Sequence, residues 1–153
     1  RMLARRRRGP FVEVDAEVER LAGMRLGDIF SIHGEAYYRR LELQALREIF
    51  LREDRVVLAT GGGVVTHAEA MALLEQHAIT VWLRAPAQLH WERVVAQGDR
   101  RPMAGNPHAR AELESIYAQR SPLYARARVT VDTHPGDVAQ VVDTLEDALH
   151  ALR

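Results

Sequence analysis

A short apolar run that ends in three consecutive glycines constrains this chain more than any other segment. Val56 to Ala59 is typical of a buried strand, Gly61 to Gly63 follow after one threonine, and a helix is expected a few residues later. Glycine has no Cβ, so it permits positive φ angles and a close approach of backbone N–H groups to a ligand. Such a junction is either a tight turn without a ligand or a cradle for an anion or a carboxylate in an α/β protein.

Strand-like segments alternate with helical ones, which predicts a doubly wound parallel α/β sheet with helices on both faces. The strand signals are residues 11–14, 56–59, 79–83 and 129–131. Helices are expected at 16–22, 26–32, 35–52, 66–76, 86–97, 109–119, 121–124 and 136–152. Asp15 is expected to cap the first of these helices, and Thr66 to Glu69 match a capping box.

The composition indicates a globular chain with one domain, residues 1–153, and excludes several kinds of site. Hydrophobic residues make up 47% of the chain, but no apolar run is long enough to cross a membrane. The chain contains no cysteine, which excludes disulfides and thiolate zinc sites, and a cytoplasmic location is expected. A formal net charge of +0 gives no overall bias towards nucleic acid.

All 21 basic residues are arginines. A phosphate-binding loop of the G-x-x-x-x-G-K-[ST] type therefore cannot lie within these 153 residues. Recognition of a phosphate or a carboxylate must use arginine side chains, backbone N–H groups or helix N-termini. The run from Arg5 to Arg8 is either a nucleic-acid patch or the solvated end of a helix, and the neutral total charge favours the helix end.

Two carboxylates stand at the end of the first strand signal. Glu13 and Asp15 are two positions apart, so both are expected at the carboxyl edge of the sheet, where ligands bind in open α/β proteins. One of them could contact Mg²⁺ and the other a substrate hydroxyl. The alternative is an exposed strand residue followed by a helix cap.

Arginines in three other segments are candidates for anion binding. Arg39 is expected in the first turn of a helix, where a cation opposes the helix dipole; it is either held there for a ligand or solvated. Arg100 and Arg101 lie in a segment rich in Gly and Pro, and such a loop can close over phosphates. Arg120 offers another guanidinium near a helix start. The histidines show no metal-ligand spacing and are interpreted as structural or exposed.

The order and spacing of these segments resemble the shikimate kinase family over essentially the whole chain. The matching segments are Phe11-x-x-x-Asp15, Ile29-Phe30, Gly34-Glu35-x-x-Tyr38-Arg39-x-x-Glu42, Leu58 to Gly63, Arg101-Pro102-Met103 and Arg120 to Tyr124. The resemblance implies a P-loop fold of the nucleoside-monophosphate-kinase type. It also implies that shikimate binds at Asp15, Arg39, Gly61, Gly62, Gly63 and Arg120.

The same resemblance implies a nucleotide side of the site. Glu13 matches an acidic position near Mg²⁺, and Arg93 is similar to an arginine beside the adenine. Arg101 matches the arginine of a lid, here about residues 98–108, that reaches the phosphates of ATP, so Asp15 and Arg101 are the candidate catalytic residues. The strand and Walker A loop of the family would precede Arg1, and the chain as printed is therefore expected not to be a competent kinase.

The lid segment 96–106, with 80–85 and 124–127, resembles a subgroup more closely: the shikimate-kinase-like C-terminal domain of helix-turn-helix regulators of benzoate degradation. This resemblance implies a ligand-sensing domain for an aromatic acyl-CoA such as benzoyl-CoA, or for a nucleotide, with DNA bound only through a domain outside this chain. The alternative is a shikimate kinase that uses ATP and Mg²⁺. In that case Asp15 would orient or deprotonate the substrate hydroxyl, and Arg39 and Arg120 would bind its carboxylate.

Overall fold

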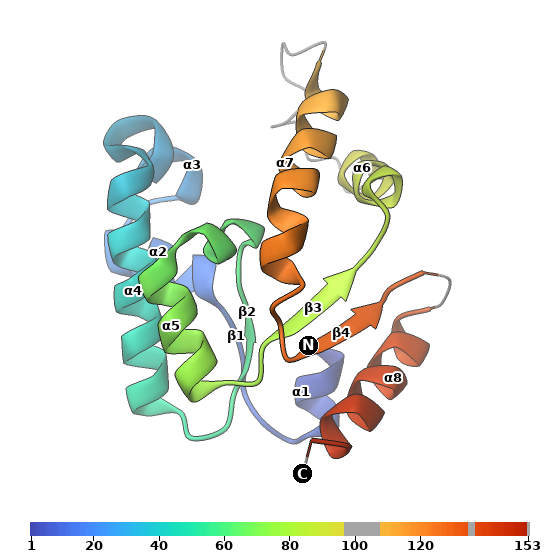
Figure 1. The fold of residues 1–153 in the computed structure, drawn as a ribbon. Coiled ribbons are helices and arrows are strands. Elements are labelled where there is room, and N and C mark those ends of the chain that lie inside the picture. The colour runs from blue at the N-terminus through green and yellow to red at the C-terminus, as the bar shows by residue number, and fades with distance from the viewer. Residues whose placement is uncertain (97–107, 135–136, 153) are drawn as a thin grey trace. The chain divides into compact units, whose positions relative to one another are not determined.

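The computed structural model describes residues 1–96, 108–134 and 137–152 (Figure 1). The chain forms two compact units, Arg1–Ile79 and Thr80–Arg153. Each unit has a parallel pair of strands, β1 with β2 in the first and β3 with β4 in the second. The expected alternation of strands and helices and the parallel pairing are therefore confirmed within the described residues.

The first unit contains both strands and glycines of the predicted site. Its elements are α1 (Met2–Arg6), β1 (Phe11–Glu13), α2 (Val14–Ala22), α3 (Leu26–Asp28), the π-helix η1 (Ile29–His33), α4 (Gly34–Arg52), β2 (Val57–Ala59), the 3-10 helix η2 (Gly62–Thr66) and α5 (Ala68–His77). Phe11 pairs with Val57 and Glu13 with Ala59. Because the strands run in the same direction, their carboxyl ends lie side by side.

Helix α4 supplies the centre of the first hydrophobic core. It packs against both α2 and α5, as Figure 1 shows. Apolar residues recur at helical spacing along one face of α4: Tyr38, Ala45, Leu46 and Ile49 are buried, and Leu41 and Phe50 are half-buried. Burial of an aliphatic side chain of this size contributes about 1.5–3 kcal/mol, so this face anchors the helix that carries the site arginine.

The second unit contains β3 (Val81–Arg84), α6 (Ala87–Ala96), α7 (Ala109–Tyr124), β4 (Val129–Asp132) and α8 (Val138–His150). Buried Val129 and Val131 alternate with exposed residues along β4, as expected for a strand with one covered face. Helix α8 packs on β4 and begins with a capping box between Asp137 and Gln140. This cap satisfies backbone N–H groups that the first helical turn leaves without partners.

Two expected helix caps are wrong. Helix α2 begins at Val14, directly after the strand, so Glu13 occupies the N-cap position and Asp15 lies in the first turn. Helix α5 begins at Ala68, and no side chain makes a cap hydrogen bond there. Thr66 instead donates from Oγ1 to the Gly63 carbonyl at 2.8 Å, because the 3-10 turn after the glycines uses that hydroxyl.

The expected break between helices 109–119 and 121–124 is also wrong, since α7 is continuous with Pro122 inside it. Pro122 removes only the backbone hydrogen bond to the Ala118 carbonyl, and Ser121 Oγ donates to the Tyr117 carbonyl at 2.7 Å one turn before it. None of the helices in the described ranges has the length and apolar character that a membrane span requires. The expected lid, apart from residue 108, lies outside the described residues, and so does Arg101.

Candidate active site

The adjoining ends of β1 and β2 bring Asp15 close to the glycine run. The first turn of α2 carries Asp15, and β2 leads through Thr60 into Gly61. A Cβ built on Gly61 would lie 3.7 Å from Asp15 Oδ2 and 3.6 Å from the Tyr38 hydroxyl. The carboxylate and the glycines thus form one edge of a site, as the parallel strand order predicts.

The glycine run is required for close approach and not for an unusual backbone conformation. Gly61 has φ −63° and ψ 147°, and among the described glycines only Gly23 and Gly34 have positive φ. A Cβ built on Gly63, however, would lie 2.6 Å from Nη2 of Arg39. Any side chain at position 63 therefore competes for space with the guanidinium group.

Arg39 lies in the second turn of α4, because that helix begins at Gly34, one residue earlier than expected. Its Nη2 donates to Glu35 at 2.9 Å and its Nη1 to Glu42 at 3.0 Å, and its side chain is 17% exposed. Burial alone would lower the pKa of Arg39, but the hydrogen bonds to Glu42 and Glu35 outweigh it and raise the pKa. The guanidinium is therefore charged and oriented before any ligand binds.

Glu42 is a fully buried carboxylate at the centre of the cluster, with 0% exposure. Its Oε2 accepts from Arg39 Nη1 and lies 3.1 Å from Nδ1 of His67. A buried carboxylate without partners would cost several kcal/mol, so these contacts are needed for the site to fold. The interpretation of the histidines as structural or exposed therefore overlooked a contact between His67 and the cluster.

Tyr38 connects Glu42 to Asp15. Its hydroxyl donates to Asp15 Oδ1 at 2.7 Å and lies 3.2 Å from Glu42 Oε1. Burial, together with the hydrogen bond to Asp15 and the charge of Glu42, raises the pKa of Tyr38 well above its ordinary value. The phenol therefore stays protonated and serves as a hydrogen-bond donor.

The sequence analysis did not predict a role in the site for Tyr38, Glu42 or His67. One signal was present: Glu42 falls within the apolar face of α4, three residues after Arg39 and four after Tyr38. A charged residue in such a stripe requires buried partners. His67 had no comparable signal, because its contact with Glu42 spans 25 residues of sequence.

Three other predicted site residues, Glu13, Arg93 and Arg120, have surroundings of their own within their units. Glu13 is exposed and forms an ion pair with Arg1 at 2.9 Å. In the second unit, Arg93 donates to Oγ1 and to the carbonyl of Thr133, both at 3.1 Å, and Arg120 lies half-buried on α7. The described residues thus bring together Asp15, Arg39, Gly61 and Gly63, with Gly62 between the glycines.

The described residues hold no group of three or more His, Cys, Asp or Glu side chains that could bind a metal by itself. Mg²⁺ in kinase sites is usually held by one or two carboxylates together with substrate phosphates. The exposed carboxylate of Glu13 at the end of β1 fits that pattern.

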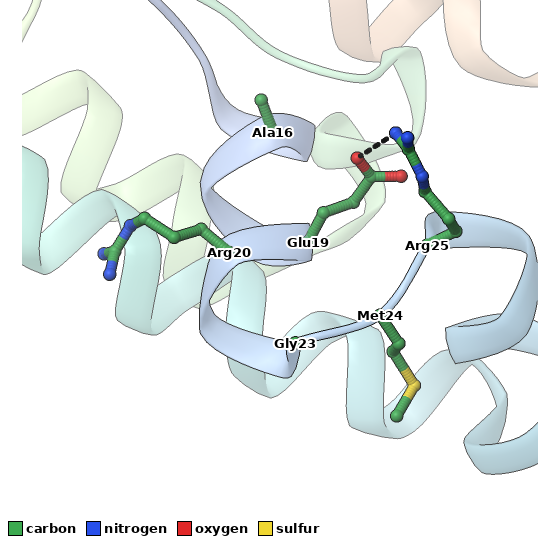
Figure 2. A pocket seen from close by; sticks show the side chains of 6 residues that line it. All are labelled: Ala16, Glu19, Arg20, Gly23, Met24 and Arg25. Carbon is green, nitrogen blue, oxygen red and sulfur yellow. Dashed lines mark ion pairs between the residues drawn. The ribbon is translucent and has the colours of Figure 1, made fainter.

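A hollow of about 420 Å³ lies beside α2 and the turn that follows it. Figure 2 shows its lining, Ala16, Glu19, Arg20, Gly23, Met24 and Arg25, with an ion pair of 3.6 Å between Arg25 and Glu19. In this view Arg20 points away from that pair. The hollow shares no lining residue with the Asp15 cluster and is a separate surface depression.

The fold places this chain in a structural class: it is an α/β protein with the P-loop fold of the nucleoside-monophosphate-kinase type. A solved shikimate kinase from Acinetobacter baumannii, in complex with shikimate, matches 99% of this chain and 84% of its own with a TM-score of 0.88 and 30% identity. The shikimate kinase from Aquifex aeolicus matches with a TM-score of 0.82 and 28% identity, over 97% of this chain and 86% of its own.

The sequence comparisons then identify the family. The family model described as shikimate kinase matches residues 1–150. The shikimate kinase of Aromatoleum aromaticum is 40% identical over 151 residues, which cover 97% of this chain and 85% of that protein. That of a Synechococcus strain is 38% identical over 144 residues, covering 92% and 75%. The chain belongs to the shikimate kinase family.

These matches correct the expectation of a regulator domain. The similarity to shikimate kinases extends across the chain, whereas the regulator resemblance rested on three short segments: the lid, the residues around β3, and the end of α7 with the turn after it. Short segments of this kind are shared by domains of one fold, so they do not discriminate between a sensor and an enzyme. The comparisons support neither an aromatic CoA thioester nor DNA as a partner. They also do not support the expectation that the chain is not a competent kinase.

Proposed function

We propose that this chain carries the substrate site of a shikimate kinase, which transfers the γ-phosphoryl group of ATP to a hydroxyl of shikimate. The observation that carries the proposal is the cluster in which Asp15 and Arg39 are held beside Gly61 and Gly63 at the ends of two parallel strands. A carboxylate that can accept a proton thus lies near a guanidinium that can bind a carboxylate. Family membership and the shikimate complex of the Acinetobacter baumannii relative support the choice of substrate.

On this proposal, the substrate carboxylate binds to Arg39 and Arg120. A guanidinium can donate two parallel hydrogen bonds to a carboxylate, which fixes both position and orientation. The backbone of Gly61 to Gly63 forms the floor beneath the ring, where the absence of side chains allows close contact. Asp15 orients the reacting hydroxyl and accepts its proton.

Binding of ATP and Mg²⁺ would involve other residues than those of the Asp15 cluster. Glu13 would hold Mg²⁺, and Arg101 of the lid would contact the phosphates. Arg93 would stack its guanidinium face on the adenine, which is compatible with in-plane hydrogen bonds to Thr133. When bound, ATP would supply the phosphoryl group, and Mg²⁺ would neutralise the charge that develops on it.

The test is an assay of the complete protein with ATP, Mg²⁺ and shikimate. We expect formation of ADP that depends on shikimate, with a phosphate ester of shikimate identified by mass spectrometry. Asp15→Asn should reduce kcat by about 100-fold or more, because the proton acceptor is lost.

The matched control for this substitution is Asp54→Asn. Asp54 is exposed and lies before β2, at the opposite end of that strand from Gly61, so its variant should keep wild-type activity. Absence of shikimate phosphorylation by the complete wild-type protein at saturating substrates would refute the proposed function.

A further inference from the structure

Tyr38 touches two carboxylates with one hydroxyl group. Its Oη donates to Asp15 Oδ1 at 2.7 Å and lies 3.2 Å from Glu42 Oε1. Tyr38 is only 5% exposed, and its ring packs on that of Phe30 with 4.7 Å between the centroids. Packing therefore holds the hydroxyl between the two carboxylates.

The single proton of the Tyr38 hydroxyl limits which of the two carboxylates it can serve as a hydrogen-bond donor. A tyrosine hydroxyl carries one proton, so it donates to one carboxylate at a time. The shorter distance assigns this proton to Asp15 in the described state. Glu42 is held at its other oxygen by Arg39 and His67, and its Oε1 faces Tyr38 as a second acceptor within hydrogen-bond distance.

We propose that Tyr38 is a positioning residue for phosphoryl transfer: its hydroxyl orients Asp15 towards the substrate and transfers its hydrogen bond to Glu42 when Asp15 becomes protonated. The inference rests on the proposed function. During the reaction the substrate O–H bond breaks and its proton goes to Asp15. The electron pair of the substrate oxygen forms the new bond to phosphorus, and the bond from phosphorus to the departing ADP oxygen breaks, with its electron pair leaving on ADP.

After that step the hydrogen bonds around Tyr38 can reverse without a change in the number of protons. Protonated Asp15 is neutral and can donate to Tyr38 Oη, while the Tyr38 O–H group donates to Glu42, which is still charged. Donation to a charged acceptor is stronger than donation to a neutral one. The hydroxyl therefore stabilises the arrangement that follows proton transfer, and this kind of interaction acts on kcat more than on substrate binding.

The test compares Tyr38→Phe with Tyr37→Phe in the complete protein. Both variants lose one phenolic hydroxyl on neighbouring residues of α4 and keep the aromatic ring. The ring of Tyr38 contacts Phe30 and Arg39, and that of Tyr37 contacts His33 and Arg40, so phenylalanine preserves the packing at either position. The measurements are kcat, KM for shikimate, the dissociation constant of shikimate by calorimetry, and the melting temperature.

We expect Tyr38→Phe to lower kcat by about 10-fold or more, as expected for loss of a hydrogen bond to a charged group, with KM and the dissociation constant of shikimate within about threefold of wild type. Tyr37→Phe should match wild type in all four measurements. A Tyr38→Phe enzyme with kcat within about twofold of wild type would overturn the inference.

Two further outcomes are distinguishable. Loss of shikimate affinity or of folded protein in parallel with kcat would show that Tyr38 acts by shaping the site, and would also overturn the inference. A wild-type protein that does not phosphorylate shikimate would overturn the proposed function and with it this inference. An active wild type with an equally active Tyr38→Phe variant overturns the inference alone.

Discussion

Replacement of Gly63 by alanine would test whether the glycine run exists to make room for Arg39. The added Cβ would lie 2.6 Å from Nη2 of Arg39, 3.4 Å from Nη1 and 3.5 Å from Cζ. To restore a contact of 3.4 Å, the guanidinium must move by about 0.8 Å, because heavy atoms repel each other strongly at shorter distances. The terminal atoms of an arginine can move, but here they are held at 2.9 and 3.0 Å by Glu35 and Glu42.

The size of the effect follows from those hydrogen bonds. A hydrogen bond to a charged group contributes about 1.5–3 kcal/mol, and a displacement of about 1 Å at a binding group can cost about 100-fold in rate. We therefore expect kcat/KM for shikimate to fall by about 10- to 100-fold in Gly63→Ala. Gly63 has no positive φ, so alanine fits the backbone and should even reduce the entropy of the unfolded chain. The melting temperature should accordingly change little.

The assay is steady-state kinetics of the complete protein with shikimate as the varied substrate, combined with thermal unfolding. Gly27→Ala in α3 is the matched control, because a Cβ at that position would meet no heavy atom within 4 Å outside its own helix and chain neighbours among the described residues. A Gly63→Ala enzyme with the kcat/KM of wild type would refute the reasoning, since it would show that Arg39 relaxes without functional cost.

Three further predictions concern the site arginine, the response to pH and the second unit. Arg39→Lys should lower kcat/KM for shikimate by about 10-fold or more, because an ammonium group cannot make the paired contacts of a guanidinium; kinetics of the variant will check this. Burial, reinforced by the charge of Arg93, lowers the pKa of His90 below 6.5, so the unfolded state binds more protons and stability is lost as the pH falls from 6.5 through the folded pKa. His90→Gln should flatten this part of the curve of unfolding free energy against pH, measured by denaturant titration. Asp137→Ala removes the cap of α8 and should lower the free energy of unfolding by about 1 kcal/mol, whereas a change at the exposed Thr130 of β4, such as Thr130→Ser, should have a smaller effect.

The elements of the fold were largely predictable because their signals are local. The apolar face of α4 repeats at helical spacing, and the strands are short apolar runs between polar segments. Helix starts were less predictable, as Val14 and Ala68 show, because they depend on which hydrogen bonds the preceding turn has already used. The continuity of α7 through Pro122 was missed because a proline predicts a helix boundary, whereas here the helix continues through it as far as Tyr124.

The sequence by itself determined which groups gather at the end of the first sheet. Asp15 and the glycines each follow a strand, and parallel strands end at a common edge, so their proximity follows from the order of the chain. Only the tertiary structure decided how these groups are connected. In the sequence, Glu42 is a charged residue within an apolar face, with no sign of its partners. In the structure, Tyr38, Arg39 and His67 lie within hydrogen-bond distance of its oxygens. A buried charge is stable only with such partners, and two of the contacts in this cluster join residues 23 and 25 positions apart, beyond the reach of any local pattern.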